Sequence, residues 1–260
     1  IMNPNEYKNQ YDILSDAFAS NIYHKGFYII NNKILEKQVD KFTNLIGKIR
    51  EKRKNHKSYN IWLKEGFSGN PYILHDKREM IELYQNDEIL NVTLNQIVKY
   101  GETYGQENSN RIKEIHGENL KITYNIMLYI MPIIFNVIRK LGYKLFELAN
   151  VKYYNILPGG KDQQLHCDGT PDAKGKNPDN IQFIYSLQDT KNDMGGTNYY
   201  LNDKLDDKWK NINSNDERSK CIGFIEDLKD KEMFYKAEHK VLLKRGELSV
   251  HLHNTIHKGC

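Results

Sequence analysis

The chain has 260 residues, of which 39% are hydrophobic and 11% aromatic, and its formal net charge is +4. This length fits one large domain, or one domain with a helical annex, and the aromatic content argues against a disordered chain. Charges of both signs are interleaved, which does not favour the one-sided basic surface of a strong nucleic-acid-binding protein. The three cysteines, Cys167, Cys221 and Cys260, are too few for a disulfide framework, so we expect a reducing compartment.

The first residues of the chain, 1–6, are polar and show no apolar core of a secretory signal. The longest apolar run, residues 126–138, is shorter than the roughly 20 residues that a membrane-spanning helix needs. We therefore expect an intracellular, cytoplasmic protein with no membrane partner, and the modest charge gives no strong sign of a nucleic-acid partner.

Up to about residue 150 the sequence carries mainly helical patterns. Residues 26–30 are expected to form a strand. Apolar residues then recur at three- and four-residue steps between 35 and 49, which indicates one face of a helix. Residues 89–100 show a second, weaker helical pattern.

The stretch from 105 to 148 divides into a polar and an apolar part. Residues 105–120 are polar and are expected to form a loop. Residues 122–148 are apolar enough for one or more helices behind a sheet, with interruptions expected at Pro132 and Gly142.

From residue 151 the chain changes to short strands and turns. The expected strands are, in chain order, 151–157, 163–168, 180–187, 197–201, 238–243 and 247–253. Residues 203–220 are charged and rich in asparagine, and are expected to form a surface insertion. Short strands separated by glycine turns are typical of a β-sandwich or barrel. We predict a helical support region over 1–150 and a strand-rich core over 151–260, integrated in one domain.

The tripeptide His166-Cys167-Asp168 is a candidate metal motif. In an extended strand residues i and i+2 point to one face, so His166 and Asp168 can bind one ion while Cys167 points away. A third ligand would come from a distant strand, where the candidates are the histidines His251, His253 and His257. Two histidines and one carboxylate on one face of a metal are typical of non-haem Fe(II) oxygenases.

Several further motifs occur in a fixed order around this tripeptide. A tyrosine-containing strand and Pro-Gly turn, residues 153–160, precede it, and Gly195-Gly196-Thr197 and the segment 246–259 with its terminal His-x-Gly follow it. In order and spacing, residues 150–260 resemble the Fe(II)- and 2-oxoglutarate-dependent dioxygenase superfamily, most closely its prolyl-hydroxylase-like branch.

The resemblance implies an α+β fold with a double-stranded β-helix (jelly-roll) core and an N-terminal helical region packed against the sheet. It implies Fe(II) bound by His166, Asp168 and His257, with 2-oxoglutarate as co-substrate and ascorbate as a reductant. The implied activity is that of an oxidoreductase, a dioxygenase that hydroxylates a C–H bond. The implied substrate is a peptidyl or protein side chain such as proline, with a small molecule as the alternative.

For the co-substrate, the resemblance suggests Tyr154 and Tyr185 as hydrogen-bond donors, although tyrosines can also simply fill a barrel. Family members carry an Arg or Lys beyond the distal histidine that pairs with the far carboxylate of 2-oxoglutarate. The chain ends at Cys260, before that position. We expect the sequence to be cut short there, and Lys174 or Lys176 to be the alternative cation by analogy with other members.

Two other classes of protein fit the same residues. A jelly-roll protein that binds a metal or another ligand without catalysis would share the fold. A zinc hydrolase could use two histidines and a carboxylate, but the sequence offers no obvious general base and no HExxH pattern.

Overall fold

The computed structural model describes residues 14, 17–54, 72–75, 77–85, 105–144, 146–168, 180–192, 194–210 and 227–260. By its internal contacts the chain forms two compact units, the first made of residues 1–39 and 162–260 and the second of residues 40–161. The boundary near residue 150, predicted from the change from helical to strand patterns, stays a prediction. No helix of the described part combines the length and apolar character needed to cross a membrane.

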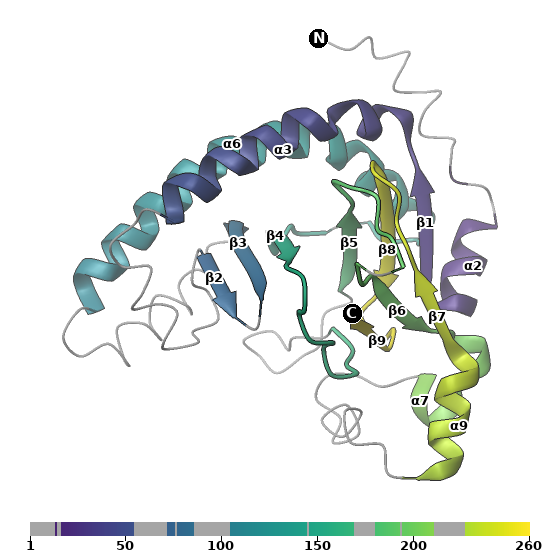
Figure 1. The fold of residues 1–260 in the computed structure, drawn as a ribbon. Helices are drawn as coiled ribbons and strands as arrows, with labels where there is room; N and C mark the ends of the chain where they lie inside the picture. Colours follow the sequence, from purple (N-terminus) through teal and green to yellow (C-terminus); the bar gives the residue numbers. More distant parts are fainter. Residues whose placement is uncertain are drawn as a thin grey trace. The chain divides into compact units, whose positions relative to one another are not determined.

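One sheet of the first unit is antiparallel, in the order β1-β8-β5 (Figure 1), with strands β1 (Phe27–Asn31), β8 (Glu247–Leu252) and β5 (Ile181–Tyr185). His251 at its centre lies directly opposite Phe27 on one side and Gln182 on the other. Residues paired in this way point to the same face of a sheet. His251 therefore shares a face with Phe27.

The second sheet of this unit has the order β7-β6-β9, with strands β6 (Thr197–Tyr200), β7 (Glu238–Val241) and β9 (His257–Gly259). Tyr199 at its centre is paired with both His239 and His257. The rings of Tyr199 and Phe27 stack with centroids 4.4 Å apart, so the two sheets pack through these faces. We call them the inner faces.

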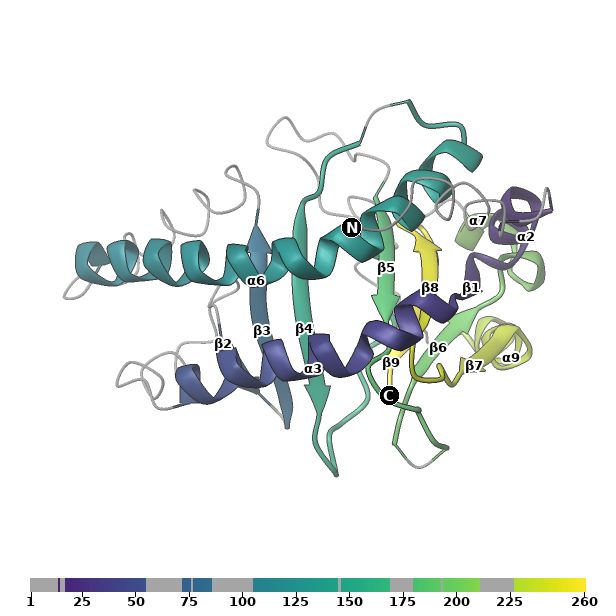
Figure 2. The same ribbon diagram turned by 90° about the horizontal axis from the view of Figure 1, so that it is seen from above.

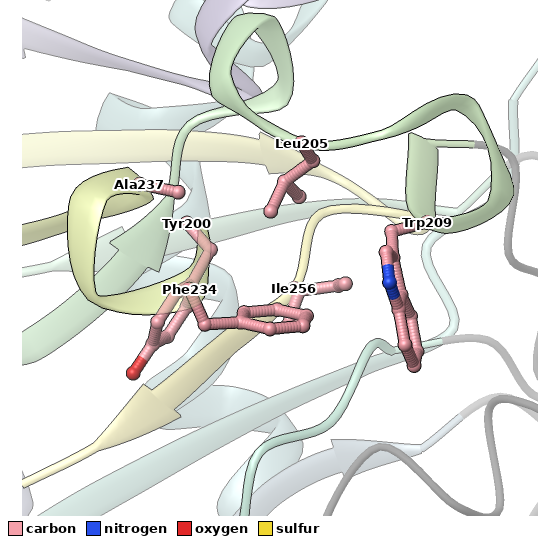
Figure 3. Close-up of a cluster of buried hydrophobic side chains, with 6 residues drawn as sticks. All are labelled: Tyr200, Leu205, Trp209, Phe234, Ala237 and Ile256. Carbon is pink, nitrogen blue, oxygen red and sulfur yellow. The ribbon is translucent and has the colours of Figure 1, made fainter. Parts of the chain in front are cut away.

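The other face of the second sheet carries an apolar cluster (Figure 3). It is covered by η1 (Asn202–Lys204), α7 (Asp207–Lys210) and α9 (Leu228–Ala237), while α2 (Phe18–Lys25) contacts η1 and β1. The buried members of the cluster are Tyr200, Leu205, Trp209, Phe234, Ala237 and Ile256. Because each buried aliphatic or aromatic side chain contributes roughly 1.5–3 kcal/mol, this cluster fixes β6 on the side away from the inner face.

The Gly195-Gly196 pair lets the last strand approach β6. Both residues have positive φ, 87° and 147°, which favours glycine. A Cβ at Gly195 would lie 2.2 Å from the Cys260 carbonyl oxygen, and the Cys260 N–H donates to the Gly196 carbonyl. The Gly-Gly-Thr motif thus has a structural reason, since it admits the backbone that follows β9.

The second unit contains a three-stranded antiparallel sheet, β2-β3-β4, with strands β2 (Tyr72–His75), β3 (Arg78–Gln85) and β4 (Asn150–Ile156). Two long helices, α3 (Lys33–Lys54), whose first residues belong to the first unit, and α6 (Gly105–Lys140), run across this sheet (Figure 2). Arg50 of α3 pairs at 2.6 Å with Glu79 of β3, which is almost fully buried. A buried carboxylate of this kind is retained only with such a partner.

Two predictions in this unit were wrong. The polar stretch 105–120 is the first part of α6 rather than a loop, because Glu, Gln, Lys and Arg are good helix formers even on an exposed surface. The helix also continues through Pro132, because buried residues on both sides of it, including Ile130 and Ile134, hold one apolar face together. The expected interruption at Gly142, with φ of 87°, is confirmed as the end of α6.

The expected strands at 26–30, 151–157, 180–187, 197–201, 238–243 and 247–253 are confirmed by β1, β4, β5, β6, β7 and β8 within a few residues at their ends. The predicted strand over 163–168 was wrong, since only His166 forms a bridge there. The helical pattern at 89–100 lies outside the described residues, as does most of the expected insertion at 203–220.

Candidate metal centre

His166 and His257 are brought together by the backbone. The His166 N–H donates to the His257 carbonyl at 3.0 Å, and the His257 N–H donates to the His166 carbonyl at 2.8 Å. A pair that exchanges both hydrogen bonds has its side chains on one face. Their rings lie with centroids 4.4 Å apart. Because His257 shares its face with Tyr199, both imidazoles belong to the inner face.

Asp168 completes a cluster with these two histidines. Its Oδ2 lies 3.3 Å from His257 Nε2, and its Oδ1 lies 3.8 Å from His166 Nε2. One ligand atom from each of the three residues lies within 4.8 Å of the others. Distances of this size suit three donors that share one ion about 2.1 Å from each of them.

Cys167 lies on the opposite side, as predicted. It packs against the apolar cluster beneath the second sheet. Burial, reinforced by the negative charge of Asp168, raises the pKa of the Cys167 thiol to about 11. The thiol is therefore protonated near neutral pH in the metal-free protein, and its place against the apolar cluster keeps it outside the group of His166, Asp168 and His257.

Backbone carbonyls fix which nitrogen each of the two histidines presents. His166 Nδ1 lies 2.8 Å from the Gln164 carbonyl, and His257 Nδ1 lies 3.0 Å from the Thr255 carbonyl. A carbonyl only accepts, so in each neutral ring the proton belongs on Nδ1 and the lone pair on Nε2. Two bare Nε2 atoms then face a carboxylate, and such converging acceptors are stabilised by a cation between them. This donor set fits a divalent metal ion.

A third histidine, His251, also reaches the carboxylate. Its Nε2 lies 3.4 Å from Asp168 Oδ2, and its ring is completely buried. Burial lowers the pKa of His251 to about 4, so the ring is neutral near pH 7. Burial alone would raise the pKa of Asp168, but the hydrogen bond from His251 and the adjacent His257 imidazole outweigh it and hold the pKa below its usual range. Asp168 is therefore ionised and accepts hydrogen bonds.

The remaining predicted residues lie elsewhere. His253 is half-buried in the turn after β8 and is not part of the described donor group. Tyr185 pairs with Leu248 on the face of its sheet opposite the inner one, where its hydroxyl donates to the Leu35 carbonyl at 2.5 Å. Tyr154 is 58% exposed on β4 of the other unit, and Lys174 lies outside the described residues. Their roles toward a co-substrate stay predictions.

No family model and no curated protein matches the sequence. Among solved structures, the fold is similar to that of non-heme alpha-ketoglutarate-dependent enzymes. The carbocyclase SnoK from nogalamycin biosynthesis aligns with a TM-score of 0.55 at 15% identity, over 96% of this chain and 79% of SnoK. At this identity the likeness establishes a common fold.

Two structures of a second enzyme align more loosely. The epimerase SnoN from nogalamycin biosynthesis has a TM-score of 0.48 at 10% identity, over 99% of this chain and 77% of SnoN. SnoN in complex with Fe3+, alpha ketoglutarate and nogalamycin RO has a TM-score of 0.47 at 11% identity, over 99% of this chain and 78% of that chain.

Proposed function

We propose that this protein is an Fe(II)- and 2-oxoglutarate-dependent oxygenase whose metal is held by His166, Asp168 and His257. The observation that carries the proposal is the convergence of two bare Nε2 atoms and an ionised carboxylate on the inner face. Two histidines and one carboxylate with open positions suit non-haem Fe(II). The fold shared with SnoK, a non-heme alpha-ketoglutarate-dependent enzyme, supports the same cofactors.

Within this proposal, O₂ would be the oxidant for attack on a C–H bond, iron would activate it, and 2-oxoglutarate would supply two electrons as it is converted to succinate and CO₂. The protein holds the ligand geometry: the carbonyls of Gln164 and Thr255 orient the two imidazoles, and Asp168 neutralises part of the metal charge. The Tyr199 ring stacks on Phe27 between the two sheets and lies beside His257, with the centroids of the Tyr199 and His257 rings 5.9 Å apart. We further propose that the two sheets of the first unit are the core of a double-stranded β-helix.

For the far carboxylate of 2-oxoglutarate, Lys174 and Lys176 are the proposed cations of this sequence. Replacing the correct lysine with alanine removes a charge-assisted bond worth roughly 1.5–3 kcal/mol. The KM for 2-oxoglutarate should then rise at least about tenfold while metal affinity is unchanged. Lys174→Ala and Lys176→Ala serve as controls for each other. A KM for 2-oxoglutarate equal to that of the wild type in both variants would exclude these lysines.

For the substrate, the likeness to SnoK, described as a carbocyclase from nogalamycin biosynthesis, supports a small molecule. A peptidyl side chain such as proline is the second candidate, because the order of the Pro-Gly, His-x-Asp, Gly-Gly-Thr and His-x-Gly motifs favours it. Hydroxylation of a C–H bond is the expected reaction for both substrate classes. Closure of a carbon ring is the alternative, because SnoK is described as a carbocyclase.

The experiment that tests the function measures succinate formed per 2-oxoglutarate consumed, with Fe(II), O₂ and ascorbate present. Panels of small cyclic metabolites and of proline-containing peptides are compared for stimulation of turnover. Stimulation by one panel assigns the substrate class, whereas succinate release must disappear in Asp168→Ala. Metal binding without any 2-oxoglutarate turnover would instead favour a binding protein, and ester hydrolysis by the zinc-loaded protein would favour a hydrolase.

A further inference from the structure

A chain of buried polar groups ends at the Asp168 carboxylate. The Tyr199 hydroxyl lies 3.2 Å from Ser249 Oγ and 3.2 Å from His251 Nδ1, and His251 Nε2 lies 3.4 Å from Asp168 Oδ2. Tyr199 and His251 are fully buried and Ser249 is 1% exposed. Buried polar groups are costly unless each finds a partner, so this arrangement is a specified feature of the inner faces.

The direction of these hydrogen bonds follows from the ligand role proposed for Asp168, because a carboxylate that binds a metal ion is deprotonated and can only accept. His251 must therefore donate through Nε2 and accept through Nδ1. The Tyr199 hydroxyl donates to that nitrogen and, in turn, accepts from Ser249. Each proton in the chain then has one acceptor.

His251 thus carries its proton on the opposite nitrogen from His166 and His257. In those two rings Nδ1–H donates a hydrogen bond to a backbone carbonyl and Nε2 carries no proton. In His251, by contrast, Nδ1 faces the Tyr199 hydroxyl. A ring that presents N–H toward the cluster donates a hydrogen bond and does not bind a metal ion. The geometry separates two ligand histidines from one that acts through the carboxylate.

We propose that His251, held by Tyr199 and Ser249, is a positioning residue that fixes the rotation of the Asp168 carboxylate and thereby sets metal affinity. This inference rests on the proposed function, because it assigns Asp168 as a ligand. Loss of a group that orients a ligand typically lowers metal affinity about 10- to 100-fold.

The test is calorimetric titration of the metal-free protein with Co²⁺, together with the visible spectrum of the bound cobalt, which reports ligand number and geometry. His251→Leu should weaken Co²⁺ binding about 10- to 100-fold and change the spectrum. His251→Gln restores an N–H donor and should recover most of the affinity. Tyr199→Phe removes only the donor to Nδ1 and should weaken binding several-fold. His24→Leu, an exposed position on α2, is the matched control and should bind Co²⁺ like the wild type.

The outcomes separate the two proposals. A wild type that binds no metal overturns both. A wild type that binds metal and releases succinate, with His251→Leu showing the same affinity and spectrum, overturns only the positioning role. If His251→Leu does not fold, Tyr199→Phe carries the test. Wild-type Co²⁺ affinity and an unchanged spectrum in Tyr199→Phe would then overturn the positioning role of His251.

Discussion

His166 and His257 form an isolated antiparallel bridge, so two proposed ligands from distant parts of the chain are set directly opposite each other by their own backbones. The bridge adds His166 to the edge of β9, which pairs in turn with β6. Metal geometry is therefore coupled to strand pairing. A change in the register of β9 would turn the His257 imidazole to the other face.

The choice of third ligand predicts a contrast between two neighbouring histidines. His257→Gln should reduce affinity for Fe²⁺ or Co²⁺ by at least about 100-fold, because it removes a direct ligand whose orientation is fixed. His253→Gln should bind the metal as the wild type does. Calorimetry on the two variants measures this, and loss of binding in the His253 variant alone would reverse the assignment.

The apolar cluster under β6 predicts a stability difference within one helix. Phe234→Ala should lower the free energy of unfolding by about 3–5 kcal/mol, because a buried ring that contacts Tyr200 and Trp209 is removed. Tyr235→Ala, at a position 78% exposed, should change it by less than about 0.5 kcal/mol. Urea denaturation measures both, and equal values would show that the cluster does not support this sheet.

Two glycines predict effects of opposite sign. Gly246 has a φ of 84° in the turn before β8, and a Cβ there would lie 2.5 Å from Glu36 Cα. Gly246→Ala should therefore cost about 2–4 kcal/mol from strain and overlap. Gly47 lies inside α3 with nothing within 4 Å of a built Cβ, so Gly47→Ala should stabilise by about 0.5–1 kcal/mol. Thermal unfolding compares them, and a neutral Gly246 variant would contradict the packing of this turn.

The raised pKa of Cys167 predicts a pH-dependent reactivity. Burial and the charge of Asp168 move the pKa from 9.0 to about 11, so the reactive thiolate is scarce at pH 8 and becomes common only as the pH approaches 11. Alkylation by iodoacetamide, followed for the Cys167 peptide by mass spectrometry, should be slow at pH 8 compared with the urea-unfolded protein. Equal rates for the folded and unfolded protein at that pH would contradict the burial of this side chain.

Much of the first unit could be predicted from sequence because its strands are short apolar runs bounded by turns. The pairing of β6 with β9 depends on close approach at Gly195 and Gly196, and the Gly-Gly-Thr motif signalled that turn. The face of Cys167 followed from alternation of side chains along an extended segment. These are local properties that one sequence expresses directly.

Other features depend on contacts that no local pattern encodes. The sequence left His251 as one of three candidates for the third ligand, and only the packing of the two sheets places it beside Asp168 as a hydrogen-bond partner. The helix α9 was missed because few of its residues are buried, although Asp227 caps it by accepting from the Lys229 N–H, a signal that sequence can show. In the stretch 163–168 only His166 forms a β-bridge. A sequence pattern typical of a strand does not reveal whether a neighbouring strand is available for pairing.

The most direct test of the iron site is anaerobic titration of the metal-free protein with Fe(II) in the presence of 2-oxoglutarate, followed by visible absorption. Chelation of the co-substrate by iron on His166, Asp168 and His257 should give a weak charge-transfer band that saturates at one iron per chain and is lost in Asp168→Ala. Absence of the band, or an unchanged band in Asp168→Ala, would contradict the assignment of these three side chains as the metal ligands.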